Sequence, residues 1–274
     1  MFEKFGGRGG NLPPVVTNII AINVLLYLIT VVGERYGLDL TRYLALYYPG
    51  SEYFQPYQLI THMFMHSGLT HLFFNMFALW MFGRVLESVW GPKRFFIYYF
   101  VTGLGAAGLH LFVNYLSIHG MMRDAQAVIS SISPDAFAVY VKDHVPEYMN
   151  RVSEFVTGWI SDPSNPSYVT EATGFINQIT DARINVPTVG ASGAVFGVLL
   201  AFGMLFPNTQ LMLLFPPIPI KAKWFVMGYG AIELWSAVLN QPGDNVAHFA
   251  HLGGMIFGFI LIKYWNRTNR KHFY

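Results

Sequence analysis

The chain has 274 residues, of which 53% are hydrophobic and only 12% are charged, and its mean hydropathy is +0.38. Soluble domains carry about 25% charged residues, so this composition excludes a soluble globular domain and indicates an all-α, polytopic membrane protein. The sequence contains no cysteine, which excludes disulfide bonds, a thiol nucleophile and thiolate metal ligands. The net charge is only +2, and we expect no nucleic-acid partner.

The start of the chain predicts a short polar segment followed by a membrane helix. Residues 1–14 are rich in glycine and form the predicted cytoplasmic N-terminal segment. The run Val15–Val32 has no charged residue over 18 positions, which is long enough to cross a bilayer. Gly33-Glu34-Arg35 follows it instead of a small-residue cleavage site, so we expect an uncleaved helix rather than a signal peptide.

Five further apolar runs follow, and we predict a six-transmembrane-helix bundle over residues 15–265 with a basic cytoplasmic tail at 266–274. A span needs roughly 17–25 residues. The fifth of the six runs is the weakest match, because it has 16 residues and contains Glu233. These five runs are Tyr57–Phe82, Phe95–Ile118, Val186–Phe206, Trp224–Leu239 and Val246–Ile262.

The distribution of charge predicts the orientation of these spans. With both termini inside, the inner segments carry eleven basic residues against two acidic ones, and the outer segments carry six against twelve. Short cytoplasmic loops are enriched in lysine and arginine, so we expect an integral membrane protein with N-in, C-in topology. For a bacterial protein this means the cell (inner) membrane. The inner basic residues are Lys4, Arg8, Arg84, Lys93, Arg94, Lys221, Lys223, Lys263, Arg267, Arg270 and Lys271.

The long outer segment 119–186 is predicted to be a helical extracytoplasmic insertion between helices 3 and 4. Apolar residues from Ala138 to Trp159 recur at spacings of three and four, which is the pattern of an amphipathic helix. Pro146 is expected to divide this pattern into two helices, and a break at 161–166 precedes a further helix at about 168–182. The insertion is either a self-packed spacer or, in our hypothesis, a cap or gate over the outer end of the fourth span.

Two short motifs place a hydroxyl and an imidazole in different apolar runs. Ser192 lies in the motif Gly190-Ala191-Ser192-Gly193, and His251 lies near the start of the last run. In the predicted orientation both lie near the outer ends of their spans, where they are a candidate nucleophile and base. A lone serine in a membrane helix is more often a packing residue. The glycines around both residues favour the catalytic interpretation, because small-xxx-small pairs allow close helix approach; the pairs are Gly193 with Gly197 and Gly254 with Gly258.

Helical geometry separates the two histidines of the last run. Gly258 and Gly254 lie about 20° and 60° from His251 around a helix, but about 80° and 120° from His248. We therefore predict His251 as the base and His248 as a neighbour that lines the site. We find no evident carboxylate partner, since Glu233 is the only carboxylate in a span and its depth is uncertain, so a Ser–His dyad is preferred to a triad.

Histidines in the second run suggest two further roles. His71 and Asn75 are four residues apart and share a helix face, where they either make a polar helix contact or supply donors to an oxyanion, together with the backbone N–H of Ser192. His62 and His66 have a spacing that can ligate zinc, but no H-E-x-x-H motif is present. We expect no metal site.

Together these elements resemble the rhomboid family of intramembrane serine proteases over about 200 of the 274 residues. The resemblance rests on H-x4-H-x3-N from His66 to Asn75, on G-x3-E at Gly83 and Glu87, and on the motifs around Ser192 and His251. The family often carries a Trp-Arg pair in the first outer loop, where this chain has Tyr57-Gln58.

The resemblance implies a six-helix rhomboid-like fold and an intramembrane serine endopeptidase that needs no cofactor. Ser192 would be the nucleophile, His251 the general base, and His71 and Asn75 the oxyanion-hole side chains. The implied partners are the lipid bilayer and transmembrane proteins, cleaved within or beside their transmembrane segments. Two alternatives stay open, namely a catalytically silent rhomboid-like protein that binds membrane clients and a transporter or channel. The supporting residues implied by the resemblance are His66, Gly190, Gly193, His248, Gly254 and Gly258.

Overall fold

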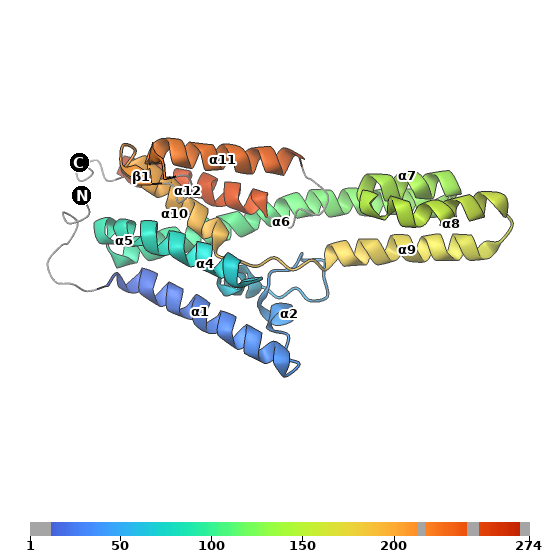
Figure 1. The fold of residues 1–274 in the computed structure, drawn as a ribbon, viewed down its shortest axis with the longest axis horizontal. Helices are drawn as coiled ribbons and strands as arrows, with labels where there is room; N and C mark the ends of the chain where they lie inside the picture. The colour runs from blue at the N-terminus through green and yellow to red at the C-terminus, as the bar shows by residue number, and fades with distance from the viewer. Residues whose placement is uncertain (1–11, 213–216, 240–246, 269–274) are drawn as a thin grey trace.

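The computed structural model describes residues 12–212, 217–239 and 247–268, and these are almost entirely helical. A bundle of helices occupies one part of the molecule, and a narrower group of helices extends from it (Figure 1). The N-terminal segment 1–11, the end of the basic tail, and residues Lys4, Arg8, Arg270 and Lys271 lie outside the described residues.

The first half of the bundle begins with a long helix and then an irregular outer segment. A continuous helical stretch follows, in which five residues take a π-helical turn, here labelled η3. The elements are α1 Pro14–Arg35, α2 Leu40–Leu44, α3 Gln58–Thr61, the 3-10 helix η2 His62–Phe64, α4 Leu69–Ala78, η3 Leu79–Gly83, α5 Arg84–Trp90 and α6 Pro92–Ser130.

The second half of the chain supplies the insertion and then the remaining helices of the bundle. A two-stranded antiparallel hairpin, with Leu211 opposite Ile220, precedes α11. The elements are α7 Pro134–His144, η4 Pro146–Tyr148, α8 Met149–Ser161, α9 Pro166–Ile184, α10 Ser192–Leu205, β1 Gln210–Met212, β2 Pro219–Lys221, α11 Ala222–Leu239 and α12 His248–Thr268.

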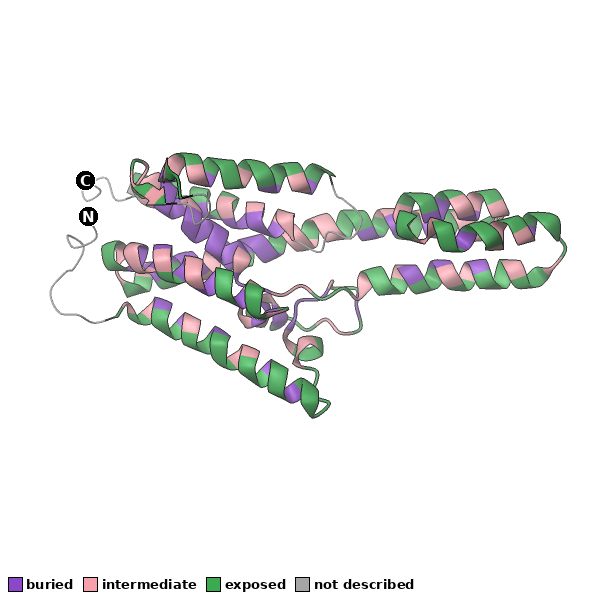
Figure 2. Ribbon diagram, in the orientation of Figure 1, coloured by how far each residue is buried: buried purple, intermediate pink, exposed green. Residues whose placement is uncertain are grey.

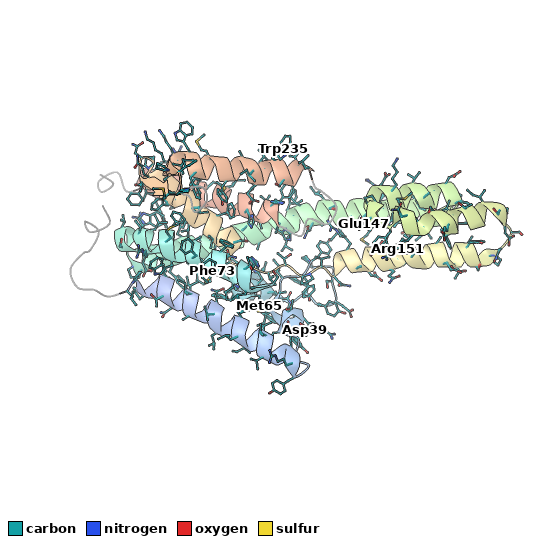
Figure 3. All side chains as sticks on the ribbon, in the orientation of Figure 1. Asp39, Met65, Phe73, Glu147, Arg151 and Trp235 are labelled. Atoms are coloured by element: carbon teal, nitrogen blue, oxygen red, sulfur yellow. The ribbon has the colours of Figure 1, made fainter. Side chains whose placement is uncertain are left out.

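Three helical stretches among the described residues are long and apolar enough to cross a membrane by length and composition: Pro14–Arg35, Leu69–Trp90 and Pro92–Ser130. Large apolar side chains on the outer faces of the bundle are exposed, as is normal for a protein solvated by lipid. Trp235 on α11, labelled in Figure 3, is 67% exposed. The fold is therefore a helical membrane bundle, and the count of six spans stays a prediction.

Two of the predicted spans begin later than the hydropathy suggests. The second run was expected from Tyr57, but its first part forms α3 and η2, and the chain is extended at Met65 before α4 starts at Leu69. The fourth run was expected from Val186, but α10 starts at Ser192. Gly190 has a φ of +128°, which is not a helical conformation. Apolar composition alone does not separate such extended segments from the helices that follow them.

α10 forms the centre of the bundle. Ten of its 14 residues are buried, and Figure 2 shows it as the most continuously buried helix. A 14-residue helix is about 21 Å long, which is shorter than the hydrocarbon thickness of about 30 Å. It packs against α6, α11 and α12 and is apolar all round rather than amphipathic.

Small residues allow α6, α10 and α12 to approach closely, as the small-xxx-small pairs predicted. A methyl group at Gly193 would meet Ala106 of α6, and one at Gly254 would overlap the backbone carbonyl of Gly193. A methyl group at Gly258 would overlap the hydroxyl of Tyr98. The positions of α10 and α12 therefore depend on glycine at these sites.

The buried carboxylate of Glu87 fixes the start of α1. Its two oxygens accept hydrogen bonds from the backbone N–H groups of Val15 and Val16, at 2.9 and 2.8 Å. These N–H groups belong to the first turn, where a helix offers no internal acceptor and where a negative charge is favoured. The middle of α5 is thereby joined to the beginning of α1.

We predict that Glu87→Ala destabilises the protein by about 2–3 kcal/mol, because two buried N–H groups lose a charged acceptor. Thermal unfolding in detergent measures this loss. The control is Glu34→Ala, which removes an exposed glutamate from α1 and is expected to change stability by less than about 0.5 kcal/mol. Equal melting temperatures for the two variants would contradict the role assigned to Glu87.

The insertion folds around an apolar core of its own. The third run was predicted to end at Ile118. Instead, α6 continues to Ser130 as one helix of 39 residues. The division at Pro146, the break at 161–166 and the last helix of the insertion are all confirmed, the last as α9. The core of buried side chains consists of Met121, Ala125, Phe137, Tyr140, Val141, Val152, Trp159, Ala172, Ile176 and Ile179.

Most of the insertion lies apart from the outer end of α10. α7 and α8 lie beside α9 in the extension, and Glu147 and Arg151 mark the end of this group nearer the bundle in Figure 3. No side chain of α7 or α8 lines the large cavity described below. The separate core supports the self-packed interpretation. Arg183 and Val186, at the end of the insertion, do line the cavity, and the cap stays a hypothesis.

Candidate active site

Ser192 and His251 form a hydrogen-bonded pair between two helices. The distance between Ser192 Oγ and His251 Nε2 is 2.8 Å. Ser192 is the first residue of α10, and His251 lies in the first turn of α12. The close approach of α12 to α10 at Gly193 and Gly254 brings the two side chains within this reach.

The ring of His251 is held in a fixed plane. It stacks on the ring of Phe196, with centroids 4.2 Å apart and an interplanar angle of 7°. Phe196 follows Ser192 by four residues, so both side chains lie on one face of α10. His251 is buried, with 8% of its surface exposed. Stacking and burial together restrict how the imidazole can rotate, and sequence reasoning did not anticipate Phe196.

Glu233 of α11 lies beside the same histidine. Its Oε2 is 2.9 Å from His251 Nδ1, although the angle is not that of a hydrogen bond, and it is 2.6 Å from His248 Nδ1. The expectation that no carboxylate accompanies His251 is therefore wrong. The sequence could not show it, because the residues are 18 positions apart and come together only through the packing of α11 on α12.

Glu233, His248 and His251 also form the cluster most suited to a metal among the described residues, with one ligand atom of each within 4.8 Å of the others. A tetrahedral zinc ion holds its ligand atoms about 3.3 Å apart, given metal–ligand distances of about 2.0–2.1 Å. The carboxylate oxygen lies closer than that to both imidazole nitrogens. The spacing thus fits polar contacts between the side chains better than coordination.

His71 and Asn75 lie on α4 and line the same cavity as Ser192. His71 Nδ1 is 3.1 Å from Ser67 Oγ, and Asn75 Nδ2 donates to the backbone carbonyl of His71 at 3.0 Å. The predicted sharing of a helix face is confirmed. His66 precedes α4 and packs edge-on against His71, with ring centroids 5.0 Å apart. His62 and His66 do not share a helix, so their spacing does not create the geometry of a zinc pair.

The segment before Ser192 is fixed at two points. Leu46 and Thr188 exchange backbone hydrogen bonds of 2.9 and 2.8 Å, and the N–H of Gly190 donates to the carbonyl of His62 at 2.9 Å. A methyl group at Gly190 would lie 2.8 Å from the His71 ring. Glycine is therefore required here both by the positive φ and by the closeness of His71.

A cavity of about 2250 Å³ opens onto the Ser192–His251 pair. It extends between α4, α10 and α11, and most of its wall is apolar. Its lining includes the site residues His71, Asn75, Ser192, His248 and His251, and the apolar residues Phe74, Met81, Phe82, Val195, Leu199 and Phe225. A polar pair in the wall of a mostly apolar cavity can act on an extended apolar ligand.

The fold and the site define a helical membrane protein with a serine–histidine pair, in which the histidine is buried and the serine is half-buried. The rhomboid domain matches residues 53–133 and 155–267, and the chain belongs to the rhomboid family. The unmatched stretch 134–154 lies within the insertion. The protein is therefore an integral membrane protein of a family of intramembrane proteases.

The similarity to individual relatives is low in identity but extends over most of the chain. Rhomboid protein 1, mitochondrial, of Saccharomyces cerevisiae is 25% identical over 214 residues, which cover 78% of this chain and 43% of the yeast protein. A mitochondrial rhomboid protein of Schizosaccharomyces pombe is 26% identical over 222 residues, or 77% and 52%. Rhomboid protease GlpG of Serratia proteamaculans is 20% identical over 260 residues, or 94% and 65%. The chain spans about half the length of the two mitochondrial relatives.

Proposed function

We propose that this protein is a serine endopeptidase that cleaves membrane proteins within or beside their transmembrane segments. The observation that carries the proposal is the 2.8 Å contact between Ser192 Oγ and His251 Nε2 in the wall of a mostly apolar cavity. A nucleophile and its base need a separation of about 2.6–3.2 Å.

In the proposed reaction, Ser192 Oγ attacks the carbonyl carbon of the scissile peptide bond and its proton passes to His251 Nε2. The C–N bond then breaks, and the same proton goes to the leaving amine. Water then gives a proton to His251 Nε2 and attacks the acyl carbon. The ester C–O bond breaks, the proton on His251 returns to Ser192 Oγ, and the product leaves as a carboxylic acid that ionises. Each step uses only this pair, the substrate and water, so the reaction needs no cofactor and no metal.

The tetrahedral intermediate carries a negative charge on oxygen, which needs donors aimed in advance. We assign this role to the backbone N–H of Ser192 and to the side chains of His71 and Asn75. Ser192 begins α10, where N–H groups have no acceptor within the helix and the helix dipole favours an anion. Gly190, Gly193, Gly254 and Gly258 support the site by allowing close approach, and His66 supports it by packing against His71.

The cavity suggests the class of substrate. Its apolar wall between α4 and α11 suits a transmembrane segment of another protein, delivered from the lipid bilayer. A helix hides its backbone in internal hydrogen bonds, so the segment must unwind before Ser192 can reach a carbonyl. We therefore propose substrates with small or helix-destabilising residues at the cleaved bond.

We also propose N-in, C-in topology and the domain boundaries of a six-helix protease domain at 15–265. Contacts support a shared end of the bundle for the start of α1, α5 and the end of α12. Glu87 of α5 accepts a hydrogen bond from the start of α1, and the ring centroids of Trp90 and Trp265 are 5.7 Å apart. Arg94 lies over the Trp265 ring at this same end, as the positive-inside rule requires for a cytoplasmic side.

The test uses purified full-length protein with a fluorescent fluorophosphonate, which labels activated serines. The same protein in liposomes is given a tagged transmembrane substrate with small residues at its outer end. We expect wild type to be labelled and to cleave, and Ser192→Ala to lose both activities. A folded wild type that shows neither would contradict the proposal and favour a catalytically silent protein that binds membrane clients.

A further inference from the structure

The buried carboxylate of Glu233 contacts two histidines of α12. Glu233 is the only acidic residue of α11 and is 8% exposed. One of its oxygens, Oε2, lies 2.6 Å from His248 Nδ1 and 2.9 Å from His251 Nδ1. A carboxylate at membrane depth is expensive to place, so its position and its partners call for a functional explanation.

His251 connects the Glu233 carboxylate with Ser192 through its two ring nitrogens. Glu233 Oε2 faces Nδ1 of His251, while Nε2 of the same ring contacts Ser192 Oγ at 2.8 Å. An imidazole can take a proton at Nε2 only if its resting proton is on Nδ1. A carboxylate beside Nδ1 favours this tautomer, and its negative charge stabilises the imidazolium that forms when the proton of Ser192 arrives.

Two neighbouring side chains, His248 and Phe196, hold the Glu233 carboxylate and the His251 ring in place. His248 contacts the same oxygen of Glu233 and so ties the glutamate to the first turn of α12. Phe196 holds the His251 ring from its face. His251 Nδ1 and Glu233 Oε2 are close, but their angle is not that of a hydrogen bond. This fits a site without substrate, since catalytic hydrogen bonds often become well aligned only when substrate binds.

We infer that Glu233 is a positioning residue that orients His251 and compensates its charge, which makes the site a Ser192–His251–Glu233 triad. This inference rests on the proposed protease function and deepens it. Glu233 acts through His251 and touches neither the substrate nor the reacting atoms.

The test compares Glu233→Gln with wild type in the cleavage assay. Glutamine has nearly the same shape and is cheaper to bury, so the variant is expected to insert and fold. We expect kcat to fall about 10²–10⁴-fold with KM within about threefold, because the loss concerns the transition state and not substrate binding. A structural defect would instead lower the melting temperature and the fraction of active protein.

Three further variants separate orientation from general damage. Glu87→Gln removes the charge of a second buried glutamate, far along the bundle, and is expected to leave kcat within about threefold. His248→Ala leaves the carboxylate beside His251 and is expected to lower kcat less than Glu233→Gln does. Added to His251→Ala, the Glu233→Gln change should cost nothing further, since groups that act as a unit are not additive.

Wild-type cleavage that depends on Ser192 establishes the protease, whatever Glu233 does. If that activity is present and Glu233→Gln keeps kcat within threefold, the triad is wrong and the dyad alone suffices. A larger loss in His248→Ala than in Glu233→Gln, or an additive loss in the double variant, would overturn it as well.

Discussion

Replacing His251 with alanine is expected to lower kcat for substrate cleavage by about 10⁴–10⁶-fold while leaving the fold intact. The loss of one member of a serine–histidine pair costs nearly as much as the loss of both, because neither acts alone. Ser192 would keep its place at the start of α10 but lose the base 2.8 Å away. Cleavage in liposomes and the rate of fluorophosphonate labelling measure the effect, and both are expected to fall together.

His119→Ala is the matched control for this variant. His119 lies in the outer part of α6, is exposed, and contacts Tyr115 and Tyr48. Its removal is expected to change neither cleavage nor labelling by more than about twofold. A His251→Ala protein that is folded and still labelled at the wild-type rate would show that another group activates Ser192.

Gly254→Ala is expected to damage both stability and activity. The added methyl group would overlap the backbone carbonyl of Gly193, which cannot move aside as a flexible side chain could. Overpacking of this kind costs about 1–3 kcal/mol. Separating α12 from α10 also moves His251 away from Ser192, and a displacement of about 1 Å can cost about 10²-fold in rate. Thermal unfolding and cleavage kinetics on the same preparation measure the two effects.

Gly228→Ala provides the control for a glycine-to-alanine change in a helix of the same bundle. Gly228 lies on α11, is exposed, and a methyl group there would meet no atom within 4 Å. Alanine is the better helix former by about 1 kcal/mol, so stability should be unchanged or higher. If Gly254→Ala behaved like Gly228→Ala, the close contact between α10 and α12 would not control the geometry of the site.

Much of the fold could be predicted because the signals are local. Charge-free runs identify the bundle helices, and the proline at 146 and the break at 161–166 divide the insertion where the structure divides it. The starting points of the helices were harder to predict. The approach to Ser192 is apolar but not helical, since its backbone pairs with Leu46 and turns at Gly190.

The site was predictable only in part, for a different physical reason. Ser192, His251, His71 and Asn75 stood out because polar groups are expensive in apolar runs and glycine spacing marks close helix contacts. Glu233 stood out in the same way. Its contact with His251 depends on which face of α11 is turned toward α12 and on the angle at which the two helices cross, which no local pattern encodes. The stacking of Phe196 on His251 likewise follows from the crossing of α10 and α12.

The two backbone attachments before Ser192 have a mechanical consequence. α6 is about 58 Å long, and its last twelve residues, 119–130, carry the insertion away from the bundle. α9 returns toward the bundle and ends at Ile184, only eight residues before the serine. The bridge between Leu46 and Thr188 and the bond from Gly190 to His62 anchor this short return to the bundle. These anchors are therefore expected to limit how far a displacement of the insertion is passed on to Ser192.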